Sequence, residues 1–161
     1  MNNFVVIHYS LITREDLGRC FFELKSKKPD GDFSEKLVRS RQPKIYLVRS
    51  EDSFLYVGYA SQSIKTRLGQ GFRANGERGY HGYKWKNLEE VELIVFVFPI
   101  LDSISKSESR KYFEAIEAEL VYKIRTHTGG WPIYQSEIHF NNTSRSEVLE
   151  IAEEMFEKLR K

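Results

Sequence analysis

The stretch KIYLVRSEDSFLYVGYASQSIKTRL, residues 44–68, decides the fold that we expect for this chain. It contains two short runs rich in β-branched and aromatic residues, and the polar turn SEDS separates them. This pattern predicts a β-hairpin. A helix is expected directly after the second run, since Ser61 or Ser63 can cap its first turn and Gly69 can end it.

The same stretch concentrates polar chemistry more tightly than any other part of the sequence. Tyr46 lies early in the first run and Tyr56 lies in the second, while Lys65 and Arg67 lie on the helix that follows. Two phenols and two cations at one end of a hairpin are side chains that can bind a phosphate group. In isolation, each tyrosine is more simply read as an ordinary aromatic residue of a sheet.

The chain beyond the hairpin predicts one further strand and two capped helices. Residues 91–98 are almost wholly apolar and are followed by proline, which predicts a buried strand. Two Ser-x-x-Glu capping boxes, which begin at Ser105 and Ser144, predict helices over 106–127 and 145–160.

The first 43 residues predict an N-terminal extension with one strand and mainly helical structure. The apolar run at 4–9 is typical of a strand, and the basic stretch 34–43 is ambiguous but can close as a short helix before Pro43. An amphipathic helix is predicted over 14–27, because apolar residues recur there at helical spacing. These residues are Leu17, Cys20, Phe21 and Leu24.

Length and composition favour one globular domain. The chain has 161 residues, of which 40% are hydrophobic, enough for a core of its own. No apolar run approaches the twenty residues of a membrane span, and the start lacks the pattern of a signal peptide. The single cysteine, Cys20, agrees with a reducing compartment. We therefore expect a cytoplasmic protein without a membrane partner.

The charge is unevenly distributed along the chain. The formal net charge is only +2, but residues 1–90 carry sixteen Lys and Arg against eleven Asp and Glu, whereas residues 91–161 carry nine against twelve. The first part is therefore suited to face a polyanion, although an ordinary asymmetric surface explains the same count. Residues 69–90 hold five glycines among several basic residues and predict a long loop.

Glu117 stands out within the predicted helix 106–127. At about 100° per residue it falls inside the apolar stripe of that helix, with Glu114 at the margin and Glu119 projecting away. A carboxylate on a buried face is costly unless it is paired or binds a metal. Two interpretations remain open from the residues alone: a buried ion pair with an Arg or Lys, or a ligand for Mg²⁺.

Taken in order, four features resemble the GIY-YIG nuclease family. They are Tyr46 in KIY, Tyr56 in YVG, Arg67 on the following helix and Glu117 in E-x-x-L-V. The resemblance covers about residues 44–135. It implies an α+β fold with a small three-stranded antiparallel sheet flanked by helices, formed as a nuclease domain over 44–161 with residues 1–43 as an extension.

The resemblance also implies an active site and a role for each residue. Tyr46 would act as the general base or position the attacking water, and Tyr56 would be a second phenol near the scissile phosphate. Arg67 would stabilise the negative charge that develops on the phosphate. Glu117 would hold one divalent metal ion, Mg²⁺ or Mn²⁺. A phenol is a poor base at neutral pH unless a neighbouring cation lowers its pKa.

The sequence departs from the family pattern at three positions. Lys44 replaces the first glycine of the motif, and Gly71 stands where many members carry His or Tyr. His81, or Tyr83 two residues later, could supply the missing side chain from the loop, although a solvated histidine is an equal reading of His81. Members also often carry an Asn after a proline that follows the glutamate helix. Here the two candidates for that role are Gln135, which is nearer to Pro132, and Asn141.

By this resemblance we expect a metal-dependent DNA endonuclease, most like a sequence-specific type II restriction enzyme that cuts double-stranded DNA as a homodimer. A repair or mobile-element nuclease on the same scaffold, a non-catalytic nucleic-acid-binding module, and a plain α/β interaction domain are the alternatives. A second basic stretch, over 36–41, is a further candidate for DNA contact. The main side chains expected to contact DNA are Lys65, Arg73, Arg78, Lys84, Lys86 and Gln135.

Overall fold

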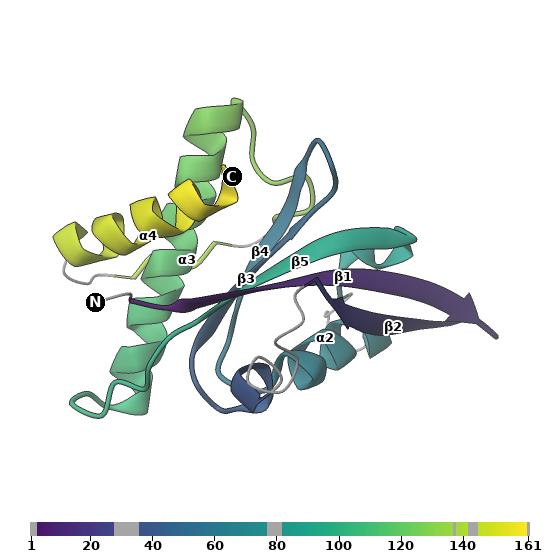
Figure 1. Ribbon diagram of the computed structural model, residues 1–161, viewed down its shortest axis with the longest axis horizontal. Coiled ribbons are helices and arrows are strands. Elements are labelled where there is room, and N and C mark those ends of the chain that lie inside the picture. Colours follow the sequence, from purple (N-terminus) through teal and green to yellow (C-terminus); the bar gives the residue numbers. More distant parts are fainter. Residues whose placement is uncertain (1–2, 28–35, 77–81, 137, 142–144, 161) are drawn as a thin grey trace.

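A computed structural model of the protein describes residues 3–27, 36–76, 82–136, 138–141 and 145–160. The described elements form three layers, with one sheet between helices on both of its faces (Figure 1). The fold belongs to the α+β class.

The sheet has five antiparallel strands, in the order β2-β1-β5-β3-β4. The strands are β1 (Val5–Asp16), β2 (Arg19–Ser26), β3 (Lys44–Arg49), β4 (Phe54–Ala60) and β5 (Glu90–Val97). The expectation of a three-stranded sheet is therefore wrong, because the segment before residue 43 adds two strands to it. The strands predicted near 44–49, 54–60 and 91–98 are confirmed.

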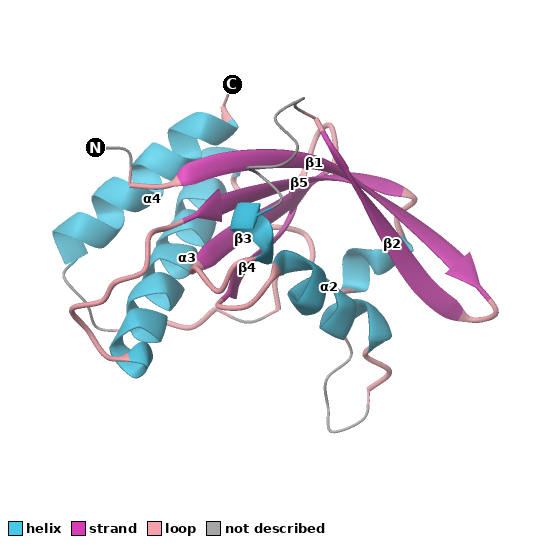
Figure 2. Ribbon diagram, turned by 60° about the horizontal axis from the view of Figure 1, so that its bottom comes forward, coloured by secondary structure: helices cyan, strands magenta, loops and turns pink. Residues whose placement is uncertain are grey.

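The helix predicted over 14–27 is replaced by a β-hairpin. β1 and β2 pair from Tyr9↔Ser26 to Asp16↔Arg19, which leaves a two-residue turn at Leu17 and Gly18. Both residues have positive φ, 49° and 73°, as a type I′ hairpin turn requires. Leucine is rare in that conformation, so the turn carries no clear sequence signal. The hairpin extends well beyond the rest of the sheet (Figure 2).

Four helical elements follow the first hairpin and the segment after it. They are α2 (Ile64–Arg73), the short 3₁₀ helix η2 (Lys84–Asn87), α3 (Lys106–Thr128) and α4 (Arg145–Leu159). The predicted helices of the C-terminal part are confirmed. α2 continues four residues past the expected stop at Gly69, because Gly69 has helical neighbours on both sides and does not take a C-cap conformation.

The caps of these helices are largely those that the sequence predicts. Ser63 accepts a hydrogen bond from the backbone of Thr66 at the start of α2. Ser105 and Glu108 form the complete capping box of α3, which ends at Gly129 in the left-handed conformation. The second predicted capping box begins at Ser144, which lies outside the described residues.

The two faces of the sheet carry separate hydrophobic cores. Alternation along β3 directs Ile45 and Leu47 to the face that α3 and α4 cover, and Tyr46 and Val48 to the face of α2. The first core includes the predicted stripe of α3, while the second includes Trp85 of η2. In the long loop predicted over 69–90, the described residues thus contribute the end of α2 and a packed helical turn.

Two smaller findings concern the remaining expectations. Residues 36–39 are helical, within the short helix expected before Pro43. Among the described residues, no helix has the length and apolar character needed to cross a membrane.

Candidate functional site

A pocket of about 270 Å³ lies near β4, the last strand at one side of the sheet, between α2 on one face and α3 on the other. Three residues predicted for the site meet there: Tyr56 from β4, Arg67 from α2 and Glu117 from α3. The other lining residues are Tyr59, Ala60, Ser61, Gln62, Arg110, Glu114 and His139. The pocket therefore unites side chains that are up to 83 residues apart in the sequence, from Tyr56 to His139.

Glu117 lies half-buried in this pocket, one turn from Glu114 on the same helix. Burial, together with the charge of Glu114, raises the pKa of Glu117 to about 8, and the nearby Arg67 guanidinium opposes this shift. A carboxyl group with such a pKa holds its proton at neutral pH. It loses that proton readily when a cation binds beside it.

Glu114 is the more buried of the two glutamates, contrary to its expected place at the margin of the stripe. Its Oε1 accepts a hydrogen bond of 2.7 Å from Nε of Arg110, and its Oε2 accepts one of 3.0 Å from Nδ2 of Asn141. Both carboxylate oxygens of Glu114 are thus held by protein groups. Glu117 also lines the pocket, where Arg67 lies close enough to oppose the rise in its pKa.

Tyr46 lies behind the pocket and does not line it. Its side chain is fully buried, and its hydroxyl is 2.8 Å from the hydroxyl of Tyr83. Burial raises the pKa of Tyr46 well above its usual value, and Tyr83 and Tyr56 add to this shift while Arg67 opposes it. The expected lowering of this pKa by a neighbouring cation is therefore outweighed by burial. The role of Tyr46 as general base stays a prediction, and the raised pKa of its phenol argues against it.

Tyr83 fills the space that Gly71 leaves on α2. A Cβ at position 71 would stand 2.6 Å from Cζ of Tyr83, and closer still to two other ring atoms. The Tyr83 hydroxyl reaches Tyr46 and also donates to the Arg67 carbonyl at 3.4 Å. Of the two candidates for the missing side chain near Gly71, Tyr83 is therefore one that lies over that position. The other candidate, His81, lies outside the described residues.

Tyr56 separates the buried phenols from the pocket. Its ring centroid lies 6.0 Å from that of Tyr46 and 5.5 Å from that of Tyr83. Because Tyr56 is half-buried and lines the pocket, it is the phenol of the three that a ligand in the pocket can touch.

Gln135 and Lys44 support the backbone around the site. The Gln135 side-chain oxygen accepts a hydrogen bond of 2.9 Å from the Val57 amide, so this residue holds β4 at the position next to Tyr56. The polar link to the pocket carboxylates comes from Asn141 instead. Lys44 is fully buried and donates to the carbonyls of Ser40, Gln42 and Gln62 at 2.8, 2.7 and 3.4 Å. Burial lowers the pKa of Lys44 to about 8.

The basic residues expected to contact DNA lie outside the pocket. Lys65, Arg73 and Lys84 are exposed, and Arg78 lies outside the described residues. Lys86 donates a hydrogen bond of 3.1 Å to the Ala74 carbonyl. Arg73 and Lys86 line a different groove, at the C-terminal end of α2.

Within the described part of the chain, no group of three or more His, Cys, Asp or Glu side chains is placed to share a metal ion. The pocket instead offers the Glu117 carboxylate, with Glu114 behind it. A single carboxylate completed by waters and phosphate oxygens is a usual way to hold Mg²⁺. The Glu117 carboxylate therefore fits the predicted Mg²⁺ ion as one protein ligand, with the substrate phosphate supplying others.

Sequence reasoning missed Arg110 and His139 among the residues that line the pocket, and it preferred Gln135 to Asn141 as the supporting amide. The spacing of Arg110 and Glu114, four residues apart on a helix, was a signal for their pairing. His139 carried no such signal, because it reaches the pocket from an irregular segment.

Comparisons of the chain with protein-family models, with curated proteins and with solved structures found no match.

Proposed function

We propose that the protein is a divalent-metal-dependent endonuclease that hydrolyses phosphodiester bonds in DNA. The observation that carries this proposal is the meeting of Arg67, Glu117 and Tyr56 in one open pocket, from three separate elements. A guanidinium, a carboxyl group and a phenol at one place can together bind a phosphodiester, hold a metal ion and position a water. The ordered resemblance to the GIY-YIG family supports the same assignment.

Arg67 is the residue proposed to bind the scissile phosphate. Its guanidinium lines the pocket, and its charge acts on both Glu117 and Tyr46. The planar fork of donors can hold phosphate oxygens and stabilise the charge that develops on them as the bond breaks.

Glu117 is the residue proposed to hold the metal ion. A divalent ion bound there would supply Lewis-acid stabilisation of charge on the phosphate. Glu117 has to lose its proton to bind the ion, so burial and Glu114 tune this carboxyl group to exchange a proton for a cation near neutral pH. Glu114, held by Arg110 and Asn141, acts as a positioning residue for that exchange.

Of Tyr46, Tyr56 and Tyr83, we assign Tyr56 to the attacking water, because it is the one of these three that lines the pocket. Tyr46 and Tyr83 form a hydrogen-bonded pair behind it and position its ring. Burial raises the pKa of Tyr46 and keeps its phenol protonated, so we assign it to positioning rather than to direct proton abstraction.

The finer proposal is a type II restriction enzyme that acts on double-stranded DNA as a homodimer. Its support is the ordered resemblance to the GIY-YIG family. A repair or mobile-element nuclease would use the same pocket, and the fragment pattern separates these roles.

The test is incubation of the purified protein with plasmid DNA and Mg²⁺ or Mn²⁺, for the wild type, Glu117→Gln and Glu119→Gln. Glu119 lies on the same helix but outside the pocket, so its variant controls for the same substitution elsewhere on α3 and for contaminating nucleases. We expect cleavage by the wild type and by Glu119→Gln, and a loss of at least about a hundredfold for Glu117→Gln.

Discrete fragments would identify sequence-specific restriction, whereas a smear or nicking would identify a less selective nuclease. Equal cleavage by all three proteins would remove Glu117 from the mechanism. If the folded wild type binds DNA but cleaves no substrate with either metal, the chain is a binding module rather than an enzyme.

A further inference from the structure

The outer edge of β2 carries backbone groups that can pair with a further strand. β2 lies at one end of the sheet, and no other described segment pairs with its outer edge. The Lys27 amide donates to the His8 carbonyl at 3.1 Å, so the odd-numbered residues of β2 turn their backbone groups toward β1. The backbone groups of Cys20, Phe22 and Leu24 therefore point outward. An open edge of this kind is a template for another strand.

Open space lies beside the first half of this edge. Five consecutive residues, 18–22, line a groove of about 660 Å³ whose other wall includes the C-terminal end of α2. Because neighbouring residues of a strand turn their side chains to opposite faces, a groove that all five residues line runs along the backbone edge itself. Figure 2 shows the hairpin of β1 and β2 reaching beyond α2. A second strand can therefore approach the edge there.

The face of β2 that points away from α2 carries an exposed phenylalanine between two opposite charges. The even-numbered residues from 20 to 24 pack in the core on the side of α2, so the odd-numbered residues lie on the other face. Glu23 lies 3.9 Å from Arg14 of β1, a loose ion pair on that face with both side chains more than half exposed. Phe21 is 53% exposed. The exposed residues of β2 on this face are Arg19, Phe21, Glu23 and Lys25.

A second copy of β2, placed antiparallel along the edge, is complementary to this pattern. When two copies of Phe21 lie opposite each other, Arg19 of each copy faces Glu23 of the other. The outward backbone groups match in the same arrangement, since Cys20 of each copy lies opposite Phe22 of the other and can exchange hydrogen bonds with it. The two Phe21 residues then form a non-hydrogen-bonded pair, the type of pair in which side chains lie closest.

Other registers place unfavourable pairs opposite each other. A centre at position 22 sets Arg19 against Lys25, and a centre at position 23 sets Glu23 against its own copy. Like charges directly opposite each other destabilise a strand pair. A centre at position 24 pairs Glu23 with Lys25 but sets Phe21 against the lysine at 27. The register centred on Phe21 joins opposite charges or apolar groups at every pair on this face from 19 to 23.

We propose that β2 pairs with β2 of a second copy of this chain, centred on Phe21, so that the two sheets join into one continuous sheet about a two-fold axis. Such an interface is isologous, because each copy contributes the same residues to it. It supplies the contact for the homodimer that the proposed function includes. The proposal goes beyond that function, since it rests on this edge strand and not on the pocket that holds Glu117.

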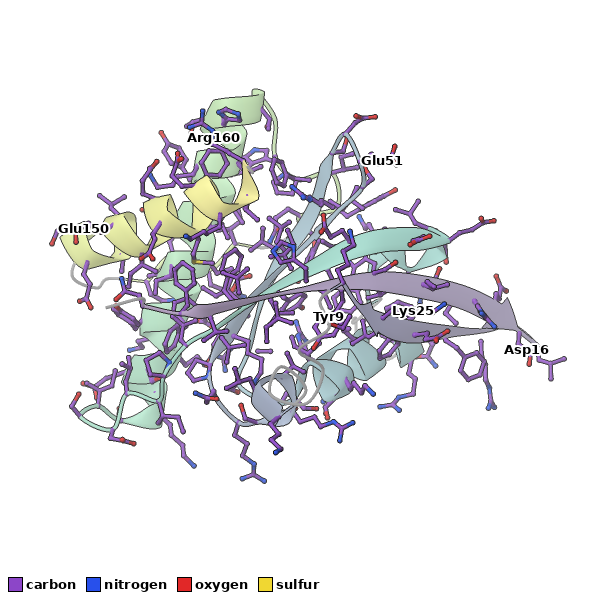
Figure 3. The ribbon with its side chains drawn as sticks, viewed as in Figure 1. Tyr9, Asp16, Lys25, Glu51, Glu150 and Arg160 are labelled. Atoms are coloured by element: carbon purple, nitrogen blue, oxygen red, sulfur yellow. The ribbon has the colours of Figure 1, made fainter. Side chains whose placement is uncertain are left out.

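The first test is sedimentation equilibrium of the full chain over a range of concentrations, without DNA or metal. The wild type is compared with Arg19→Glu, Glu23→Arg, the double variant Arg19→Glu/Glu23→Arg, and Lys25→Glu. Lys25→Glu is the matched control, because it makes the same change of charge as Arg19→Glu on the same face of the same strand, outside the proposed pairs. Figure 3 labels Lys25 on this hairpin, with Asp16 at its tip.

We expect the wild type to form a dimer. Each single reversal places like charges opposite each other at both symmetric pairs, so it should weaken the dimer about tenfold or more. The double variant restores opposite charges at both pairs and should dimerise as the wild type does. Lys25→Glu should change the affinity by less than about threefold, since an exposed charge outside the pairs is largely screened. Far-ultraviolet circular dichroism checks that each variant is folded.

Disulfide formation tests the register independently. Phe21→Cys, Glu23→Cys and Lys25→Cys are made one at a time with Cys20→Ala and are oxidised with copper phenanthroline. Phe21→Cys should give a covalent dimer, because opposite Cα atoms of a non-hydrogen-bonded pair are about 4.5 Å apart, within disulfide range. The two copies of position 23 would lie about 14 Å apart, so Glu23→Cys should stay monomeric on a non-reducing gel, as should Lys25→Cys.

A wild type that stays monomeric up to its solubility limit would overturn the proposal. A dimer that the single reversals do not weaken, or that the double variant does not restore, would overturn it as well. Crosslinks at 23 or 25 in place of 21 would refute the register. None of these measurements involves Glu117 or cleavage, so the plasmid test of Glu117→Gln stands or fails separately.

Discussion

The Tyr83 ring packs over Gly71 of α2 and not over Gly69, so alanine substitutions at these two glycines should change the stability of the protein in opposite directions. Gly69 and Gly71 both lie inside α2, two residues apart. An alanine at 69 would meet nothing nearer than the Arg73 guanidinium, at 3.6 Å, which is ordinary contact with a flexible side chain. Replacing a glycine by alanine inside a helix stabilises it by about 0.5–1 kcal/mol. Gly69→Ala should therefore raise the free energy of unfolding by that amount.

Gly71→Ala gains the same helix propensity but meets the Tyr83 ring. Ordinary contact begins at 3.4 Å, whereas the new Cβ would stand 2.6 Å from Cζ and nearer to two other ring atoms, so the ring has to move by about 1 Å or more. Trp85, stacked at 4.6 Å, and the Tyr46 hydroxyl at 2.8 Å prevent an easy shift. Overpacking costs about 1–3 kcal/mol, and loss of the hydroxyl pair costs about 1 kcal/mol more.

The expected outcome is a gap of about 2–4 kcal/mol between the two variants, with Gly71→Ala the less stable, since the gain in helix propensity is the same in both. Urea denaturation measures this gap, and thermal melts should separate by about 5–15 °C. The near-ultraviolet circular dichroism of Trp85 should change in Gly71→Ala alone, because its stacking partner moves. Equal stability and an unchanged spectrum in both variants would refute the placement of Tyr83 over α2.

Three further predictions follow from the pocket and the opposite end of the sheet. The pKa of Glu117 is about 8 in the folded protein and about 4.5 in the unfolded chain, so the folded protein holds an extra proton between these pH values. The free energy of unfolding of the wild type should therefore fall relative to that of Glu117→Gln as pH rises from 5 to 8. Urea titrations should show a fall of up to about 1.4 kcal/mol per pH unit. An unchanged difference across that range would contradict the assigned burial of Glu117. Burial acts to raise the pKa of Glu92, but hydrogen bonds from Arg49, Lys27 and His8 outweigh this effect and lower the pKa to about 2. Glu92→Gln should therefore destabilise the protein by about 1–3 kcal/mol at pH 7. This loss of stability should shrink as pH falls from about 4.5 towards 2, because the wild-type carboxylate is then protonated. Equal losses at pH 7 and pH 3 would argue against those contacts. Tyr56→Phe should lower cleavage by about 10²–10⁴ with little change in stability, while Tyr46→Phe should retain more activity and lose about 1 kcal/mol of stability; the reverse order of activities would return the water-activating role to Tyr46.

Local signals predicted the elements with strong periodicity or clear caps. The hairpin of residues 44–60 and the helix that begins at Ser105 appear as expected, because alternation and a capping box are written in adjacent residues. The N-terminal hairpin was misread, since Leu17, Cys20, Phe21 and Leu24 also fit a helical stripe. Every second residue from Cys20 to Leu24 is also apolar, as in a strand. The pairing of β1 with β5 decides between the helical and the strand interpretation.

The candidate site was predictable where a residue type and a helical position sufficed. Arg67 and Glu117 are brought together as expected. The sequence left two loop residues, His81 and Tyr83, as candidates for the side chain missing at Gly71, because only packing determines which loop residue reaches the helix. The burial of Tyr46 depends on long-range contacts in the same way, so its raised pKa could not be inferred from neighbours in sequence.

The position of β5 at the centre of the sheet has a consequence for how the chain is made. β5 joins β1 to β3, yet both of those strands leave the ribosome well before it. At about 5–20 residues per second, roughly 2–7 s pass between the synthesis of Ala60 and that of Val97. During that time two finished hairpins each have an open edge, and nothing in the sheet links them. Completion of the sheet therefore waits for a late segment, and this interval is when nascent chains are most exposed to pairing with one another.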